Sequence, residues 1–179
     1  MLYTTKHGAT MRYAQRIGEP TDALVKETVY ARLEKAKTYD AIVLGCPVYM
    51  DKIKGLDFFA DHAKDLLDKR LILFTCGLND PTQADVKEKL EAQLKEKLGD
   101  ALEHIAVFHL RGALRWQNLG LAERLMMKAL VSGMKKKPED QLTETERLLI
   151  ETEGGALDFS DEADIASIVH AVRFGREAE

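Results

Sequence analysis

The chain has 179 residues, of which 45% are hydrophobic and 31% are charged, and its formal net charge is −4. This length suits one domain with a sizeable core, and the composition is typical of a globular protein. The weak negative charge and the lack of a basic stripe interleaved with aromatic residues argue against a nucleic-acid partner. No apolar run approaches the roughly 20 residues that span a bilayer. Two cysteines without a disulfide framework lead us to expect a cytoplasmic protein.

The first distinctive feature is a turn at residues 4–10, between a short apolar start and a predicted helix. It contains the hydroxyls of Thr5 and Thr10 and a glycine, Gly8. A strand, turn and helix of this kind direct backbone N–H groups, hydroxyls and a helix dipole at one point, where a phosphate monoester would bind. An ordinary turn, with Thr10 as the helix cap and Gly8 easing the bend, explains the same residues.

Three continuous apolar runs predict strands buried on both faces, as in a parallel sheet. They cover residues 40–45, 70–75 and 104–110, and Pro47 is expected to end the first of them. A weaker strand candidate covers residues 23–29.

Helices are predicted between these strands and after them, from their apolar periodicity. Gly99 is expected to stop one of them, and the helix at 121–137 is expected to pack its apolar stripe on the sheet. Within that stripe we place Ala122, Leu125, Met126, Ala129, Leu130 and Gly133. The more charged segment 138–158 predicts an insertion with its own short helix, for which Thr143 and Glu146 supply a capping box.

Strands that alternate with helices predict a doubly wound α/β fold, a three-layer sandwich around a five-stranded parallel sheet in the order 2-1-3-4-5. We expect one such domain over residues 1–179, the insertion included. In this order a ligand crevice lies at the carboxyl ends of the first and third strands. The turn at 5–10 and the loop at 47–53 both fall there, which favours the phosphate interpretation.

These residues resemble the flavodoxin family, whose FMN phosphate loop is a hydroxyl-rich turn that closes in Gly-x-Thr. The resemblance implies non-covalent FMN binding in a flavodoxin-like fold. The phosphate would be held by Thr5, Lys6, His7, Gly8, Ala9 and Thr10. The loop along the flavin ring would be formed by Pro47, Val48, Tyr49, Met50 and Asp51. The third loop would be formed by Thr75, Cys76, Gly77 and Leu78.

The sequence Gly-Ala-Leu-Arg-Trp at residues 112–116, with the helix that follows it, is similar to the branch that contains menaquinone-dependent protoporphyrinogen IX dehydrogenase. This implies an oxidoreductase in which the flavin carries the electrons, so no catalytic side chain is assigned. Arg111 and Arg115 would bind the propionates of a porphyrinogen and Trp116 would lie against its macrocycle. Surface ion pairs explain the two arginines equally well.

For several side chains the sequence leaves two interpretations open. Lys6 and His7 either add charge at the phosphate or are solvated, and Tyr49 either stacks on the flavin or packs its loop. Cys46 and Cys76 either form a redox dithiol beside the ring or are small buried hydrophobic groups. No spacing of His, Cys or Asp indicates a metal site.

The expected partners are an organic electron donor and a quinone or protein acceptor. We expect at most peripheral contact with a membrane. The sequence leaves open whether the protein forms a homodimer. An electron carrier without its own substrate is the first alternative, and a binding module without cofactor is the second. Carriers dock through strong acidity, whereas Lys6, Lys52 and Lys54 lie near the expected flavin edge, which favours an enzyme.

Overall fold

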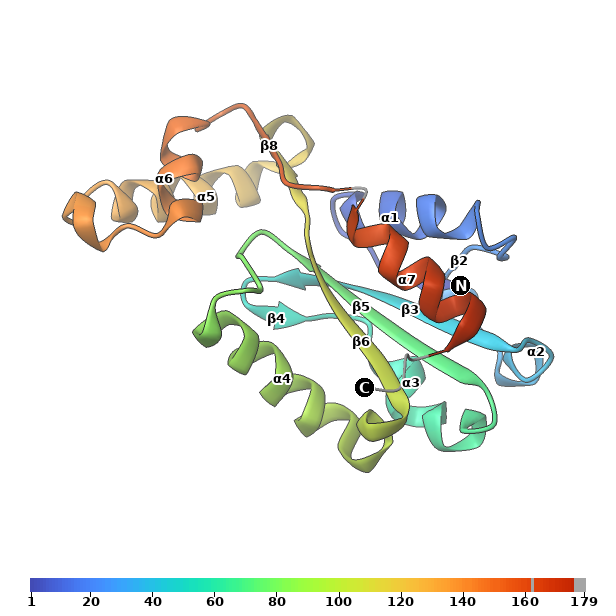
Figure 1. Cartoon of the computed structure of the whole chain (residues 1–179). Coiled ribbons are helices and arrows are strands. Elements are labelled where there is room, and N and C mark those ends of the chain that lie inside the picture. The colour runs from blue at the N-terminus through green and yellow to red at the C-terminus, as the bar shows by residue number, and fades with distance from the viewer. Residues whose placement is uncertain (162, 176–179) are drawn as a thin grey trace.

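A computed structural model describes residues 1–161 and 163–175 (Figure 1). At its centre a parallel sheet runs in the order β2-β1-β3-β5-β6, which confirms the predicted order 2-1-3-4-5 and the α/β fold class. The parallel strands are β1 (Leu2–Tyr3), β2 (Lys26–Glu27), β3 (Ala41–Tyr49), β5 (Arg70–Gly77) and β6 (Ile105–Arg111). A further short strand, β4 (Lys52–Ile53), pairs with β3 in the antiparallel sense.

Helices cover both faces of the sheet, which is therefore the middle of three layers (Figure 1). Side chains of β3 alternate between the two cores, with Leu44 in one and Val43 in the other. On the Val43 side lie α1 (Ala9–Gly18) and α7 (Ala163–Phe174). On the Leu44 side lie α2 (Leu33–Ala36), α3 (Asp57–His62) and α4 (Ala84–Leu98). Short 3₁₀ turns occupy Thr28–Tyr30, Ala63–Leu66, Gly99–His104, Trp116–Asn118 and Glu139–Gln141.

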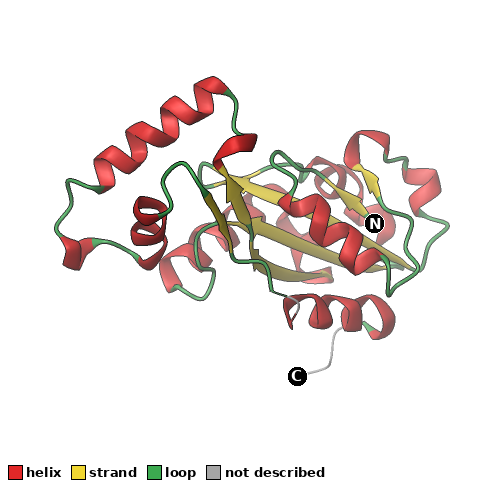
Figure 2. Ribbon diagram, turned by 90° about the horizontal axis from the view of Figure 1, so that it is seen from above, coloured by secondary structure: helices red, strands yellow, loops and turns green. Residues whose placement is uncertain are grey.

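Residues 113–158 form a separate unit beside the sheet, which we call the arm (Figure 2). Its strands β7 (Ala113–Arg115) and β8 (Ala156–Asp158) pair in the antiparallel sense. Its helices are α5 (Leu121–Met134) and α6 (Glu144–Glu151). The arm has its own small core, to which Trp116, Val131 and Leu149 belong.

Two helix ends lie where the sequence places them. At α6 the Glu146 N–H donates to Thr143 Oγ1 at 3.2 Å and the Thr143 N–H donates to Glu146 Oε2 at 3.0 Å, so the capping box is present. The helix α4 ends at Gly99, whose φ of 54° is in the left-handed region that favours glycine.

The expectation that Pro47 ends its strand is wrong. The strand β3 continues to Tyr49, with Pro47 opposite Cys76 of β5. Proline cannot donate a hydrogen bond to a neighbouring strand. At this point no such bond to β1 is lost, because β1 has already ended on that side of β3. The Pro47 carbonyl accepts instead from the Lys54 N–H at 3.0 Å, which brings β4 into the place that β1 has left.

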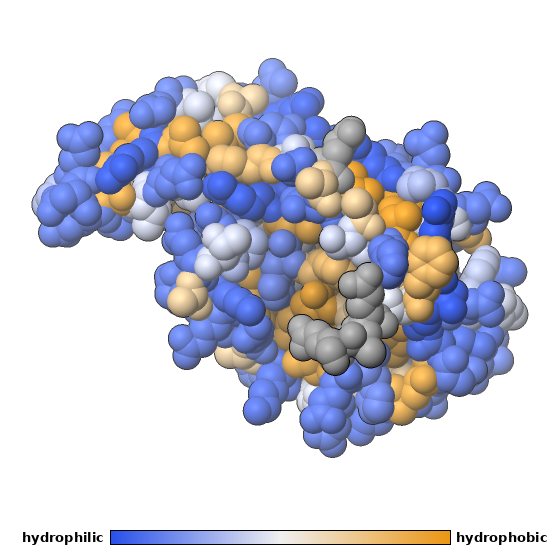
Figure 3. Space-filling model, viewed as in Figure 1, coloured by the Kyte–Doolittle hydropathy of each residue, from blue (hydrophilic) through white to orange (hydrophobic). Residues whose placement is uncertain are grey.

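The expected packing of α5 on the sheet is also wrong. Leu121 and Leu125 are 78% and 62% exposed, whereas Val131 is buried in the arm. Part of the predicted stripe is therefore uncovered, because periodicity alone does not say which side of a helix its neighbours will cover. Figure 3 shows the apolar side chains that gather along the arm. No helix of the described residues is long and apolar enough to cross a membrane.

Candidate flavin site

A cavity of about 560 Å³ lies between the carboxyl ends of the strands and the arm. This volume is within the usual range for cofactor sites. Each predicted flavin-binding residue except Gly8 lines it, which brings three loops from distant parts of the sequence to one place. These lining residues are Thr5, Lys6, His7, Ala9, Thr10, Pro47, Val48, Tyr49, Met50, Asp51, Thr75, Cys76, Gly77 and Leu78.

The first loop has the backbone of an anion-binding turn. Gly8 has a φ of 87°, and its N–H donates to Thr5 Oγ1 at 3.0 Å, which folds the loop back on itself. The helix α1 begins directly after Gly8, and no side chain of the described residues caps its first turn. Its first N–H groups therefore remain available to a ligand, beside the Thr10 side chain, which is 1% exposed.

Lys6 and His7 of this loop face the arm. Lys6 Nζ lies 2.8 Å from Glu123 Oε1 of α5 and 3.6 Å from the centre of the Tyr49 ring. His7 Nε2 is buried without a hydrogen-bond partner among the described residues, 3.7 Å from Glu123 Oε1. Burial lowers the pKa of His7. A neutral imidazole is therefore expected at pH 7.

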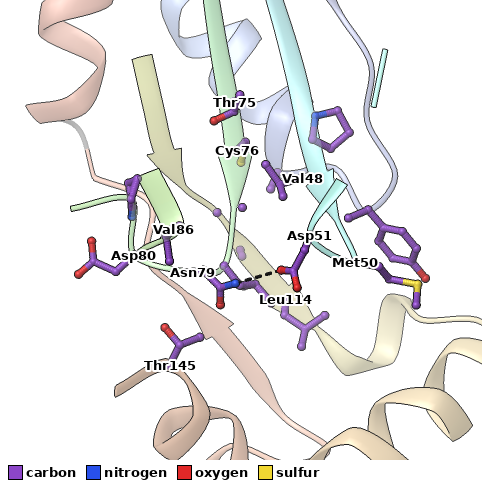
Figure 4. A pocket seen from close by; sticks show the side chains of 18 of the residues that line it. Val48, Met50, Asp51, Thr75, Cys76, Asn79, Asp80, Val86, Leu114 and Thr145 are labelled. Carbon is purple, nitrogen blue, oxygen red and sulfur yellow. Dashed lines mark hydrogen bonds between the residues drawn. The ribbon is translucent and has the colours of Figure 1, made fainter. Parts of the chain in front are cut away.

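The second loop is a tight hairpin between β3 and β4. Met50 and Asp51 have φ values of 51° and 57°, which a two-residue type I′ turn requires. Asn79 Nδ2 donates to Asp51 Oδ1 at 3.2 Å, a bond that Figure 4 shows between the second and third loops. Gln93 Nε2 of α4 donates to the Asp51 carbonyl at 2.9 Å. These bonds fix the turn beside the cavity although neither turn residue is glycine.

A histidine of β6, the last strand of the parallel sheet, also reaches the cavity. His109 Nδ1 and Thr75 Oγ1 share a hydrogen bond of 2.7 Å, because the two residues are opposite each other in β6 and β5. Burial lowers the pKa of His109. In the sequence His109 interrupts an apolar run, which favours a core or supporting position, whereas the structure places it in the lining of the cavity.

The arm supplies an apolar roof that the sequence did not reveal. Most of it comes from one face of α5, and α6 contributes one further side chain. The roof residues are Met126, Met127, Leu130, Met134 and Leu149. Methionine side chains are flexible and polarisable, so such a surface adapts to apolar ligands of different shapes.

A family model described as a flavodoxin domain matches residues 1–141. The chain belongs to the flavodoxin family. Two similar solved structures are flavodoxins. Two-electron reduced Megasphaera elsdenii flavodoxin is 21% identical with a TM-score of 0.44, over 62% of this chain and 82% of that chain. Oxidised flavodoxin 1 of Bacillus cereus is 16% identical with a TM-score of 0.41, over 93% of this chain and 95% of that chain. No match was found among curated protein sequences.

The predicted substrate residues of this flavodoxin domain do not line the cavity. Arg111 donates to Thr145 Oγ1 at 3.3 Å, and its guanidinium lies 3.5 Å from the centre of the Phe159 ring. Arg115 is exposed, with its guanidinium 3.9 Å from Asp158. Trp116 is 4% exposed and belongs to the core of the arm. Arg111 therefore holds the base of the arm, Arg115 lies on the arm's surface, and the Trp116 indole is not presented to a ligand.

The two cysteines lie on opposite faces of the sheet. Cys46 belongs to the core with α3 and α4, and Cys76 to the core with α1 and α7. The register agrees, because the residue opposite Cys46 is Thr75, one position before Cys76. The two side chains therefore point apart, which rules out the dithiol considered from the sequence.

We expect neither thiol to react with Ellman's reagent at pH 8 in the folded protein, and both to react in guanidinium. Burial raises the pKa of Cys76 to about 12 and raises that of Cys46 as well, so little thiolate is present. Absorbance at 412 nm measures the number of thiols that have reacted. One or two fast-reacting thiols in the folded protein would contradict this placement.

Membership of the flavodoxin family implies flavin binding, and the first loop fits a phosphate. The fit rests on the uncapped start of α1, the left-handed Gly8 and the buried, partnerless His7 Nε2. The phosphate would meet backbone N–H groups and hydroxyls here, while the charge of Lys6 is already matched by Glu123.

Proposed function

We propose that this protein binds FMN and works as an oxidoreductase on an apolar organic substrate. Thr5, Thr10 and the N–H groups of residues 6, 7, 9 and 10 would hold the phosphate, since the Gly8 N–H already donates to Thr5 Oγ1. The loops at 47–51 and 75–78 would place the ring in the cavity. When bound, FMN supplies hydride and electron transfer, and the protein sets its orientation and surroundings.

The observation that supports an enzyme is the roof over the cavity. Met126, Met127 and Leu130 of α5 cover an apolar space beside the flavin loops. A protein that only exchanges electrons with other proteins needs an exposed flavin edge and no such compartment. The resemblance of residues 112–116 supports protoporphyrinogen IX or a related donor with a quinone as acceptor. Arg111, Arg115 and Trp116 lend this substrate no support, because they lie outside the cavity.

An electron carrier is the second candidate, favoured by the exposure of the second loop. Met50, at the tip of the hairpin, is 61% exposed, so one edge of the site faces solvent. A reductase could then exchange electrons with the flavin directly.

Introducing a charged side chain into the roof distinguishes the enzyme from the electron carrier. With FMN-loaded protein, protoporphyrinogen and a menaquinone analogue, we expect Met126→Asp to raise KM at least about 10-fold, because a carboxylate is costly to bury in an apolar site. The FMN affinity is measured alongside, so that a loss of cofactor is not counted as a loss of substrate binding. Leu125→Asp is the matched control, since Leu125 is the neighbouring residue on the exposed face.

Two results would contradict the enzyme. No turnover by the wild type, together with rapid reduction by a flavodoxin reductase, would favour the carrier. Purified protein that stays colourless and does not bind added FMN would remove both redox functions and favour a binding module.

A further inference from the structure

One carboxylate joins three segments that are far apart in the sequence. Glu123 Oε1 lies 2.8 Å from Lys6 Nζ of the first loop and accepts from the Tyr49 hydroxyl at 3.3 Å. Its other oxygen, Oε2, accepts from the Gly120 N–H at 3.0 Å at the start of α5. Since Lys6 Nζ also lies over the Tyr49 ring, the four groups form one closed cluster at the edge of the cavity.

The position of Glu123 along α5 connects this cluster with the roof. Met126, Met127, Leu130 and Met134 follow it by three, four, seven and eleven residues, which places them all on the same face of the helix. All four line the cavity, as Glu123 does. Glu123 is therefore the polar first member of the stripe that covers the site.

The arm is fixed to the rest of the protein at its base as well. There the Phe159 N–H donates to the Gly112 carbonyl at 3.0 Å, and Arg111 binds Thr145 of α6. The start of α5 is tied across the cavity by Glu123. Without that contact the base would remain, and the end of the roof over the first loop would lose its polar attachment.

The charges suit a fastening role better than a role in phosphate binding. The hydrogen bond from Lys6 lowers the pKa of Glu123 to about 2, so the pair is ionised and neutral overall at pH 7. A free anion at this edge would repel a phosphate, whereas the paired carboxylate does not.

We propose that Glu123 is a positioning residue of the flavin site. Its carboxylate clamps the arm to the first loop and to Tyr49, and thereby holds the apolar roof over the cavity. Opening this clamp admits the substrate. The geometry of the clamp stands without FMN, while its role in substrate access rests on the proposed function.

Hydrogen exchange of the protein without FMN tests the clamp from both sides. Lys6→Met breaks the ion pair without touching α5. Glu123→Gln also breaks it, but keeps the acceptor for the Gly120 N–H, because glutamine serves equally in a capping box. In both variants we expect amides 124–130 to exchange about two- to five-fold faster, the range for an exposed ion pair.

The arm offers a matched control. Lys135 and Glu153 form another Lys–Glu pair, 2.6 Å apart, at the far end of α5. Glu153→Gln should leave amides 124–130 unchanged. Raising NaCl from 10 to 500 mM should speed their exchange in the wild type and not in Lys6→Met, because salt screens exposed charges. Unchanged exchange in both Lys6→Met and Glu123→Gln would overturn the clamp.

The FMN-loaded protein gives a second readout. Quenching of flavin fluorescence by acrylamide should rise about two-fold in Glu123→Gln and stay at the wild-type value in Glu153→Gln, because the opened roof exposes the ring. Faster exchange without increased quenching would overturn the roof's role in access. If the wild type binds no FMN, the proposed function fails, and the exchange experiment still decides whether the clamp exists.

Discussion

Replacing Thr10 by valine is expected to weaken FMN binding by about 10- to 100-fold. The two side chains have nearly the same shape, so the change removes a hydroxyl that is 1% exposed at the start of α1. A hydrogen bond to a charged group contributes about 1.5–3 kcal/mol, and the buried phosphate would lose one donor without replacement by water. Fluorescence titration of FMN measures the change.

Riboflavin is the control ligand, because it carries the same ring without the phosphate. Thr10→Val should bind riboflavin as the wild type does, within about two-fold. The Thr10 hydroxyl also lowers the pKa of the Cys76 thiol, and any loss of stability from losing this interaction would affect both ligands alike. Equal weakening of FMN and riboflavin would show that Thr10 does not contact the phosphate.

Replacing Gly45 by alanine is expected to lower the free energy of unfolding by about 2 kcal/mol. Gly45 lies in the middle of β3, opposite Phe74 of β5, whose ring covers it. A Cβ at this position would fall on the ring, within 2.8 Å of Phe74 Cε1. Phe74 is completely buried, so its ring cannot move aside without disturbing the core with α1 and α7.

Urea unfolding of three further variants tests this reason. Phe74→Leu should reduce the cost of Gly45→Ala, so that the double variant is more stable than the two separate losses predict. Gly133→Ala should stabilise the protein by about 0.5–1 kcal/mol, because Gly133 lies inside α5 with open space at its Cβ position. Additive losses in the double variant would mean that the ring is not what excludes a side chain at Gly45.

The sheet and the first loop could be predicted because their signals are local. The runs that became β3 and β5 are apolar throughout, and a strand with both faces covered admits little else. The turn that contains Gly8 and Thr10 shows its chemistry within a few residues. Once the strand order follows from the alternation of elements, the three loops must meet at the carboxyl edge of the sheet.

The roof could not be predicted, because its position depends on contacts far along the chain. Glu123 meets Lys6 across 117 positions, and nothing near either residue marks the other as its partner. One signal was present: a stripe of α5 starts at Glu123 and continues through Met127 and Met134. The stripe predicted from the sequence shares Met126 and Leu130 with it, but its other large side chain, Leu125, is exposed.

By itself, the sequence determined the α/β class, the strand order and the position of the phosphate-type turn, since hydrophobic periodicity and backbone preferences act over short distances. Only the tertiary structure decided that β3 passes through Pro47, that Trp116 is buried and that α5 turns its methionines toward the cavity. The physical reason is the same in each case. A proline or an apolar side chain is compatible with several environments, and the neighbours that the fold brings to it select one.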